Sequence, residues 1–176
     1  MVRQGGVEGT KMFALGGRSF TKRIAQVFGT TFDEAEKKKI KYSAGELEKE
    51  DNEFIKNALK TDCQVWLSGV ELTLEEFSQV ELLPSRILLC GGGAILPEIQ
   101  KTLENAQWSP NLPFARQPSV HFIKPGDVEN ITDQTGELKN PWDITPMSLA
   151  NLGIDLVGEE KITDSILNRI VKSLRE

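Results

Sequence analysis

Apolar residues in the first half of the chain recur at helical spacing. From Leu47 to Val70 they follow one another in steps of three, four and seven, which predicts a long helix. Two shorter helices are predicted ahead of it, one ending at Gly29 and one from Phe32 to Tyr42. The second has acidic residues in its first turn and lysines near its end, as the helix dipole favours.

Short apolar runs of another kind predict strands. Ile87–Cys90 is continuously apolar, too short for a helix and bounded by Pro84 and glycine, which indicates a buried strand in a parallel sheet. Pro97 stands at the favoured first position of a following helix. Ser119–Ile123 is predicted as a further strand, so the chain alternates helices and strands and its fold class is α/β.

The remaining elements are shorter or lie near the end of the chain. Thr10–Leu15 is predicted as a short strand before a helix capped by Ser19 or Thr21. Thr73 with Glu76 fits a capping box and predicts a short helix of its own. A helix is expected to begin at Thr145.

The last predicted helix runs from Thr163 to Leu174 and carries one apolar stripe. We expect Ile166, Ile170 and Leu174 to pack against the domain. The alternative is a membrane anchor, since a basic amphipathic helix binds anionic surfaces, but the basic excess of about two charges predicts only weak or indirect membrane contact. The stripe has no tryptophan or phenylalanine, which favours packing.

Composition excludes several classes of function. The formal net charge of -5 over 176 residues argues against a nucleic-acid partner. The only histidine is His121, which argues against a histidine metal site or a Ser-His nucleophile. Cys63 and Cys90 lack metal-ligand spacing and fit a reducing cytoplasm. No metal-ligating or catalytic residues are predicted.

The segment from Ile87 to Pro97 carries the strongest chemical signal, a buried strand that runs through Gly91, Gly92, Gly93 and Ala94 into a helix. Glycine lets a flat ligand approach the backbone closely, and the following helix presents free N–H groups to negative charge. The alternative is a tight turn with no ligand.

Three motifs in this order resemble the actin-like ATPases, most closely the bacterial FtsA and PilM proteins. The glycine turn resembles their adenosine motif, and the stretch from Gly16 and Gly17 to Ala25 resembles GG-x-x-[FIL]-T-x-x-I-A. Asp33–Tyr42 resembles their EEAExxKIKYG stretch. The resemblance covers about residues 10–100 well and continues loosely to Asp155.

The resemblance implies a site for ATP or ADP. Glu36 and Lys39 correspond to the family's ExxK pair, which reaches the ribose and adenine, and positions three apart share one helical face. We expect the adenosine to lie between Gly91, Gly92 and Gly93 and the helix that bears Glu36 and Lys39, with Gly16, Gly17 and Ala94 as further contacts. Without the resemblance, Glu36 and Lys39 would be read as a solvated charged face.

The resemblance also shows departures. The family's acidic loops that hold magnesium and phosphates have no counterpart, because Gly5–Thr10 lacks the leading aspartate. We therefore expect the magnesium ligands to lie outside this chain, and the chain alone not to hydrolyse ATP. Arg18 stands where the family carries aspartate or another residue.

As a whole, the resemblance implies an RNase H-like subdomain with a mixed sheet flanked by helices, comprising residues 1–16 and 81–176, and a smaller helical lobe at residues 17–80. It implies the adenosine-binding half of a cytoplasmic, nucleotide-dependent scaffold in cell division or pilus assembly, with other subunits or like protomers as partners. The alternatives are a nucleotide-free interaction or polymerisation module and a fragment of a heat-shock-chaperone-like ATPase.

Overall fold

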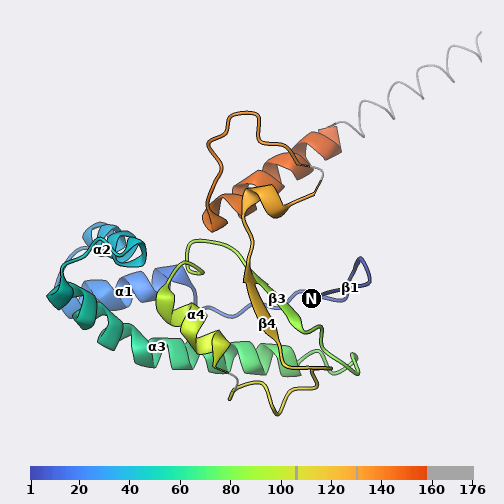
Figure 1. The fold of residues 1–176 in the computed structure, drawn as a ribbon, viewed down its shortest axis with the longest axis horizontal. Helices are drawn as coiled ribbons and strands as arrows, with labels where there is room; N and C mark the ends of the chain where they lie inside the picture. Colours follow the sequence, from blue (N-terminus) through green and yellow to red (C-terminus); the bar gives the residue numbers. More distant parts are fainter. Residues whose placement is uncertain (106, 130, 158–176) are drawn as a thin grey trace, which may run out of the picture. The chain divides into compact units, whose positions relative to one another are not determined.

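The computed structural model describes residues 1–105, 107–129 and 131–157. It divides into two compact units, Met1–Phe122 and Ile123–Glu176, which are described separately. Unit 1 contains, in chain order, β1 (Val2–Arg3), β2 (Gly6–Val7), α1 (Gly17–Phe28), α2 (Phe32–Ala44), α3 (Lys49–Glu75), β3 (Arg86–Leu89), α4 (Pro97–Glu104) and β4 (Ser119–Phe122) (Figure 1). The expected α/β class is confirmed.

Local sequence signals set the ends of α1 and α2. Glycines in the left-handed conformation close both helices, Gly29 at φ 63° and Gly45 at φ 73°. Thr31 and Glu34 form a capping box at the start of α2. The prediction that Ser19 or Thr21 caps α1 is wrong, because Gly16 is the N-cap and both residues lie inside the helix.

The helix α3 is longer than its apolar periodicity predicts. It covers 27 residues and includes Thr73, for which a separate helix start is predicted. The Thr73 hydroxyl instead donates to the Gly69 carbonyl within α3, at 2.6 Å. The Phe13 ring packs against the same Gly69, where a β-carbon would lie 2.9 Å from it.

The described residues of unit 1 form two two-stranded sheets, and the sheet of β3 and β4 is parallel, as the apolar run of β3 predicts. The strands β3 and β4 pair in the register Arg86↔Ser119 to Leu89↔Phe122, and α4 connects them. The strand predicted at Thr10–Leu15 is not formed, because that segment pairs with no other backbone among the described residues. The hairpin β1–β2 precedes it and turns through Gln4 and Gly5, both with positive φ.

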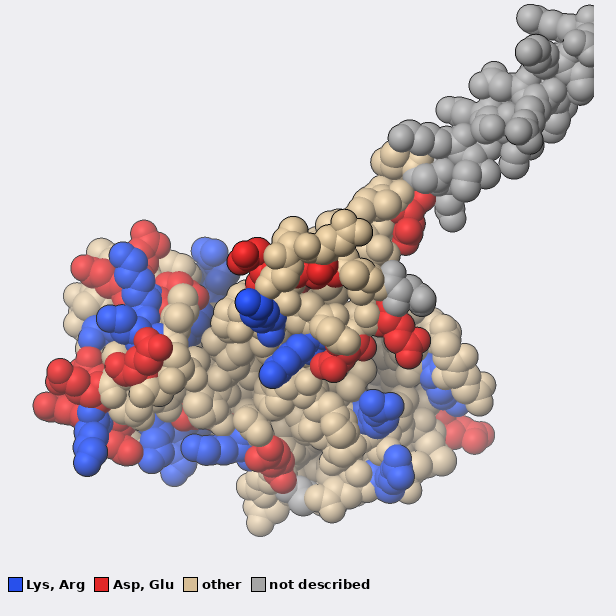
Figure 2. Space-filling model, turned by 45° about the horizontal axis from the view of Figure 1, so that its top comes forward, with Lys and Arg blue, Asp and Glu red and all other residues tan. Residues whose placement is uncertain are grey.

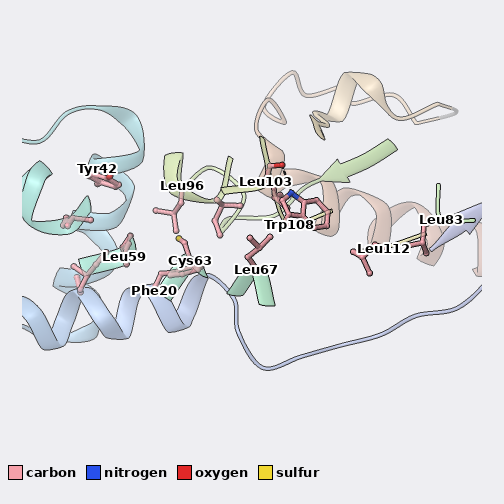
Figure 3. Close-up of a cluster of buried hydrophobic side chains, with 14 of the residues drawn as sticks. Phe20, Tyr42, Leu59, Cys63, Leu67, Leu83, Leu96, Leu103, Trp108 and Leu112 are labelled. Atoms are coloured by element: carbon pink, nitrogen blue, oxygen red, sulfur yellow. Dashed lines mark hydrogen bonds between the residues drawn. The ribbon is translucent and has the colours of Figure 1, made fainter. Parts of the chain in front are cut away.

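The core of unit 1 is assembled along α3. Buried side chains of α3 contact α1 on one side and α4 on another, and Figure 3 shows Cys63 of α3 between Phe20 and Leu96. The cluster continues through Trp108 and Leu112 toward Leu83. One face of the β3–β4 sheet joins this core, whereas the other face leaves Leu88 51% exposed.

Unit 2 begins with two short 3-10 helices, Pro125–Asp127 and Pro141–Asp143, and residues 144–157 are helical. Ile144 and Met147 are buried, close to the start expected at Thr145. The helix expected from Thr163 lies outside the described residues. Of the residues described, no helix is long and apolar enough to span a bilayer. The assignment of residues 17–80 to a smaller lobe stays a prediction.

Candidate functional site

The glycine turn between β3 and α4 has the backbone geometry that its sequence predicts. Gly91 adopts φ +90°, a conformation that other residues rarely take. The N–H of Ala94 donates to the Gly91 carbonyl at 3.1 Å, which closes the turn. The chain then enters α4 with Leu96 as N-cap and Pro97 as the first helical residue, as expected.

This turn touches the start of α1 through two glycine backbones. A β-carbon on Gly93 would lie 3.2 Å from the Gly17 nitrogen, and one on Gly17 would lie 3.4 Å from the Gly93 nitrogen. A side chain at position 93 would therefore push the start of α1 back slightly, whereas a β-carbon at position 17 would make an ordinary contact. The two glycine segments, which are far apart in the sequence, therefore meet at one place in unit 1.

Lys39 of α2 is buried beside this contact between Gly17 and Gly93. Its side chain is only 6% exposed, and its ammonium nitrogen lies 2.8 Å from Glu36 Oε2. The same nitrogen donates to Thr21 Oγ1 at 2.9 Å and to the Gly17 carbonyl at 3.3 Å. All three ammonium hydrogens thus have acceptors within the protein, which is how a buried cation is accommodated.

Glu36 lies beside Lys39 but remains open to solvent, with 36% of its side chain exposed. Its Oε2 accepts from Lys39 and, at 2.5 Å, from the Thr21 hydroxyl. Burial raises the pKa of Glu36, but the hydrogen bonds from Lys39 and Thr21 and the charges of Lys39 and Arg18 outweigh it, so the net pKa is lowered. The carboxylate is therefore ionised at neutral pH.

The structure brings together four of the eight residues predicted for the site: Gly17, Gly93, Glu36 and Lys39. Gly91 and the buried Ala94 shape the turn. A β-carbon at Gly16 or Gly92 would meet no atom within 4 Å, so there is open space beside the backbone at both positions. The role of all eight as nucleotide contacts stays a prediction.

Thr21 is a member of this cluster that sequence reasoning did not assign to it. Its side chain is fully buried, and its hydroxyl lies 2.9 Å from the Gly17 carbonyl one turn earlier in α1. The signal was present in the sequence, since a threonine four residues after a glycine at a helix start points back toward that glycine. The sequence pattern predicts Thr21 only as a candidate cap of α1.

Two surface features of unit 1 lie apart from each other, a region of mixed charge and an apolar groove. Figure 2 shows basic and acidic side chains interspersed over the end formed by α1 and α2. A separate groove of about 750 Å³ follows β3, away from the Glu36 cluster. Its lining is mainly apolar, with basic side chains among it: Met1, Val2, Lys11, Thr73, Leu74, Phe77, Leu83, Pro84, Ser85, Arg86, Ile87, Leu88, Phe114 and Arg116.

In a parallel β3–α4–β4 unit, the glycine turn meets the start of α1, and the Glu–Lys pair of α2 binds that same helix start through Lys39 and Gly17. The motifs predict this combination for an actin-like protein. The sequence model of the type IV pilus assembly protein PilM family matches residues 4–111, which is more than half of the 176 residues. The chain therefore belongs to the PilM family, and the predicted resemblance to actin-like PilM proteins is confirmed. Neither a curated protein nor a solved structure matches it significantly.

Proposed function

We propose that this chain is the adenosine-binding half of an actin-like ATPase that acts in type IV pilus assembly as a nucleotide-dependent scaffold. The ligand is ATP or ADP, and the partners are other subunits or like protomers in the cytoplasm, with no nucleic acid and at most indirect membrane contact. The proposal includes an RNase H-like core. Family membership supports it, and so does the cluster around Glu36.

The single observation that carries the proposal is the asymmetry of the Glu36 carboxylate. Oε2 is engaged by Lys39 and Thr21, whereas none of the described hydrogen bonds involves Oε1. An ionised, half-exposed oxygen on a rigidly held side chain is a strong acceptor for hydroxyl groups. The vicinal hydroxyls of a ribose are donors of this kind.

The neighbouring backbone suits the remainder of an adenosine. The open space at Gly92 allows a flat ring to approach the chain where a side chain would block it. Lys39 has no free hydrogen for the ligand, and its contribution in this proposal is to hold Glu36 and the Gly17 carbonyl in place. Lys39 is therefore a positioning residue, and Glu36 is the ligand contact.

We propose no magnesium ligand in the Glu36 cluster. The cluster offers one carboxylate, Glu36, whereas magnesium in nucleotide sites is bound through carboxylates together with phosphates and waters. The acidic loops of the family are not matched in this sequence, so we expect no magnesium-dependent ATP hydrolysis by the chain alone. Measurable turnover by pure material would contradict that expectation.

Calorimetric titration of adenosine and ADP into the full chain tests the proposal, with Glu36→Gln as the variant. Glutamine keeps the size of the side chain but replaces the ionised acceptor. Glu46→Gln is the matched control, because Glu46 is exposed and its side chain makes no described hydrogen bond. We expect weak binding that Glu36→Gln lowers by about tenfold, equal to roughly 1.4 kcal/mol, and that Glu46→Gln leaves unchanged.

Two results would refute the adenosine site. One is the absence of binding at millimolar adenosine and ADP. The other is binding whose NMR shift changes avoid the amides of Gly17 and Gly93. Thermal unfolding of Glu36→Gln shows whether a loss of binding reflects the ligand contact or a loss of fold.

A second function, that of a nucleotide-free interaction module, is favoured by the surface along β3. The apolar groove there and the exposed Leu88 leave hydrophobic area uncovered in unit 1. Sedimentation velocity over a range of concentrations tests it, with Leu88→Gln as the variant. Self-association that Leu88→Gln abolishes, in a chain that binds no nucleotide, would favour this function over the first.

A further inference from the structure

Arg18 occupies an electrostatically unfavourable position at the start of α1. It is the second residue of the helix, directly after Gly17, and the first turn contains no acidic residue. The N-terminus of a helix carries partial positive charge, so a cation there is disfavoured. The rest of α1 adds Lys22 and Arg23 and no carboxylate, which does not relieve the repulsion.

The guanidinium of Arg18 is held in place by an aromatic ring and not by an ion pair. Its Cζ lies 5.0 Å from the centre of the Phe32 ring, at the start of α2. Within the described part of the chain, no carboxylate lies in salt-bridge distance of it. Arg23 on the same helix differs, because it forms two hydrogen bonds with Asp62 at 2.8 and 2.9 Å.

Arg18 gives the Glu36 cluster an excess of positive charge. Arg18 directly follows Gly17, whose carbonyl accepts from Lys39, so Arg18 adjoins the cluster in which Lys39 contacts the single carboxylate of Glu36. The charges of both cations lower the pKa of Glu36, and the N-terminus of α1 adds partial positive charge. This excess stands out in a chain whose formal net charge is -5. Neutral adenosine leaves it uncompensated, whereas a phosphorylated nucleoside neutralises it.

We propose that Arg18 binds a phosphate group of the nucleotide whose ribose is held by Glu36, and this inference rests on the proposed function. A guanidinium donates through several N–H groups in a fixed fork, which matches the oxygens of a phosphate. The Phe32 ring restricts the side chain before the ligand arrives, so less conformational freedom is lost on binding. The site thereby discriminates adenosine phosphates from adenosine.

The test compares adenosine, ADP and ATP as ligands for the full chain and for Arg18→Gln, which removes the charge. Lys22→Gln is the matched control, since it removes an exposed cation one turn further along the same helix. We expect Arg18→Gln to weaken ADP and ATP about tenfold and to leave adenosine within about twofold. Lys22→Gln should change none of the three by more than about twofold, and Arg18→Lys should recover part of the loss.

The outcomes separate this inference from the adenosine site itself. If wild-type chain binds adenosine as tightly as ATP, or if Arg18→Gln weakens all three ligands equally, Arg18 is not a phosphate contact although the adenosine site stands. If wild-type chain binds none of the three, both fail. Thermal unfolding provides a second readout, because Arg18→Gln loses the contact with the Phe32 ring but relieves the unfavourable charge at the helix start, so the melting temperature should change little. A large fall in the melting temperature together with weaker binding of all three ligands would show a structural role instead.

Discussion

The buried pair formed by Tyr42 and Glu98 allows a quantitative test of how α2 and α4 are held together. Both residues are nearly inaccessible, with 5% and 7% of their surface exposed. The Tyr42 hydroxyl donates to Glu98 Oε1, and Oε2 has no partner within the described residues. A carboxyl group removed from water thus depends on one hydrogen bond.

Tyr42→Phe should therefore lower the free energy of unfolding by about 1–3 kcal/mol, because the buried Glu98 carboxyl group is left without its one described hydrogen bond. Glu98→Leu leaves the Tyr42 hydroxyl unpaired and should cost about 1–3 kcal/mol. The double variant removes both polar groups and should be more stable than the sum of the single changes predicts, by more than about 1 kcal/mol.

Urea denaturation followed by tryptophan fluorescence measures these values, since the chain contains three tryptophans. An unchanged dependence on urea concentration shows that the variants unfold in the same way as the wild type. The Tyr42–Glu98 pair does not hold α2 and α4 together if Tyr42→Phe changes the free energy of unfolding by less than about 0.5 kcal/mol, or if the two single changes add without coupling.

Three further predictions concern packing, thiol reactivity and titration. Gly69→Ala should lower the urea midpoint, because the clash with Phe13 at 2.9 Å outweighs the gain of about 1 kcal/mol in helix propensity, and Phe13→Ala should restore it. Iodoacetamide should label the exposed Cys90 and spare Cys63, because Cys63 is buried and burial raises its pKa to about 12. Peptide mass mapping measures the labelling, and equal labelling of both thiols would contradict the buried position of Cys63. Hydrogen bonds from Thr135 and from backbone N–H groups lower the pKa of Asp133 to about 2. The stabilising contribution of Asp133 should therefore be present above about pH 4 and lost as the pH falls through about 2. An NMR titration of Asp133 with a midpoint near about 4 would refute this.

The regular elements could be predicted where the signal is local. The acidic first turn of α2, Pro97 at the start of α4 and the apolar run of β3 each act within a few residues, and these elements are confirmed. Thr10–Leu15 shows why other predictions are wrong. A strand requires a partner backbone, and the residue pattern of one segment does not reveal whether that partner exists.

The candidate site likewise combines features that local spacing predicts with features that depend on how the helices pack. The placement of Glu36 and Lys39 on one face of α2 follows from their spacing, and their hydrogen bond confirms it. The contact between Gly17 and Gly93 depends on how α1, α3 and α4 pack, which the spacing does not contain. The inward direction of Lys39, with all its hydrogens used by the protein, is likewise a result of packing.

The length of α3 has a consequence for how unit 1 unfolds. At 27 residues it extends over about 40 Å, and its buried face contributes Ile55 near one end of the core and Leu67 further along. Because α1 and α4 both pack against this one helix, neither side of the core can lose its structure while the other keeps a full set of contacts. Unit 1 should therefore unfold cooperatively, with amides of α1 and α4 exchanging with solvent through the same global opening.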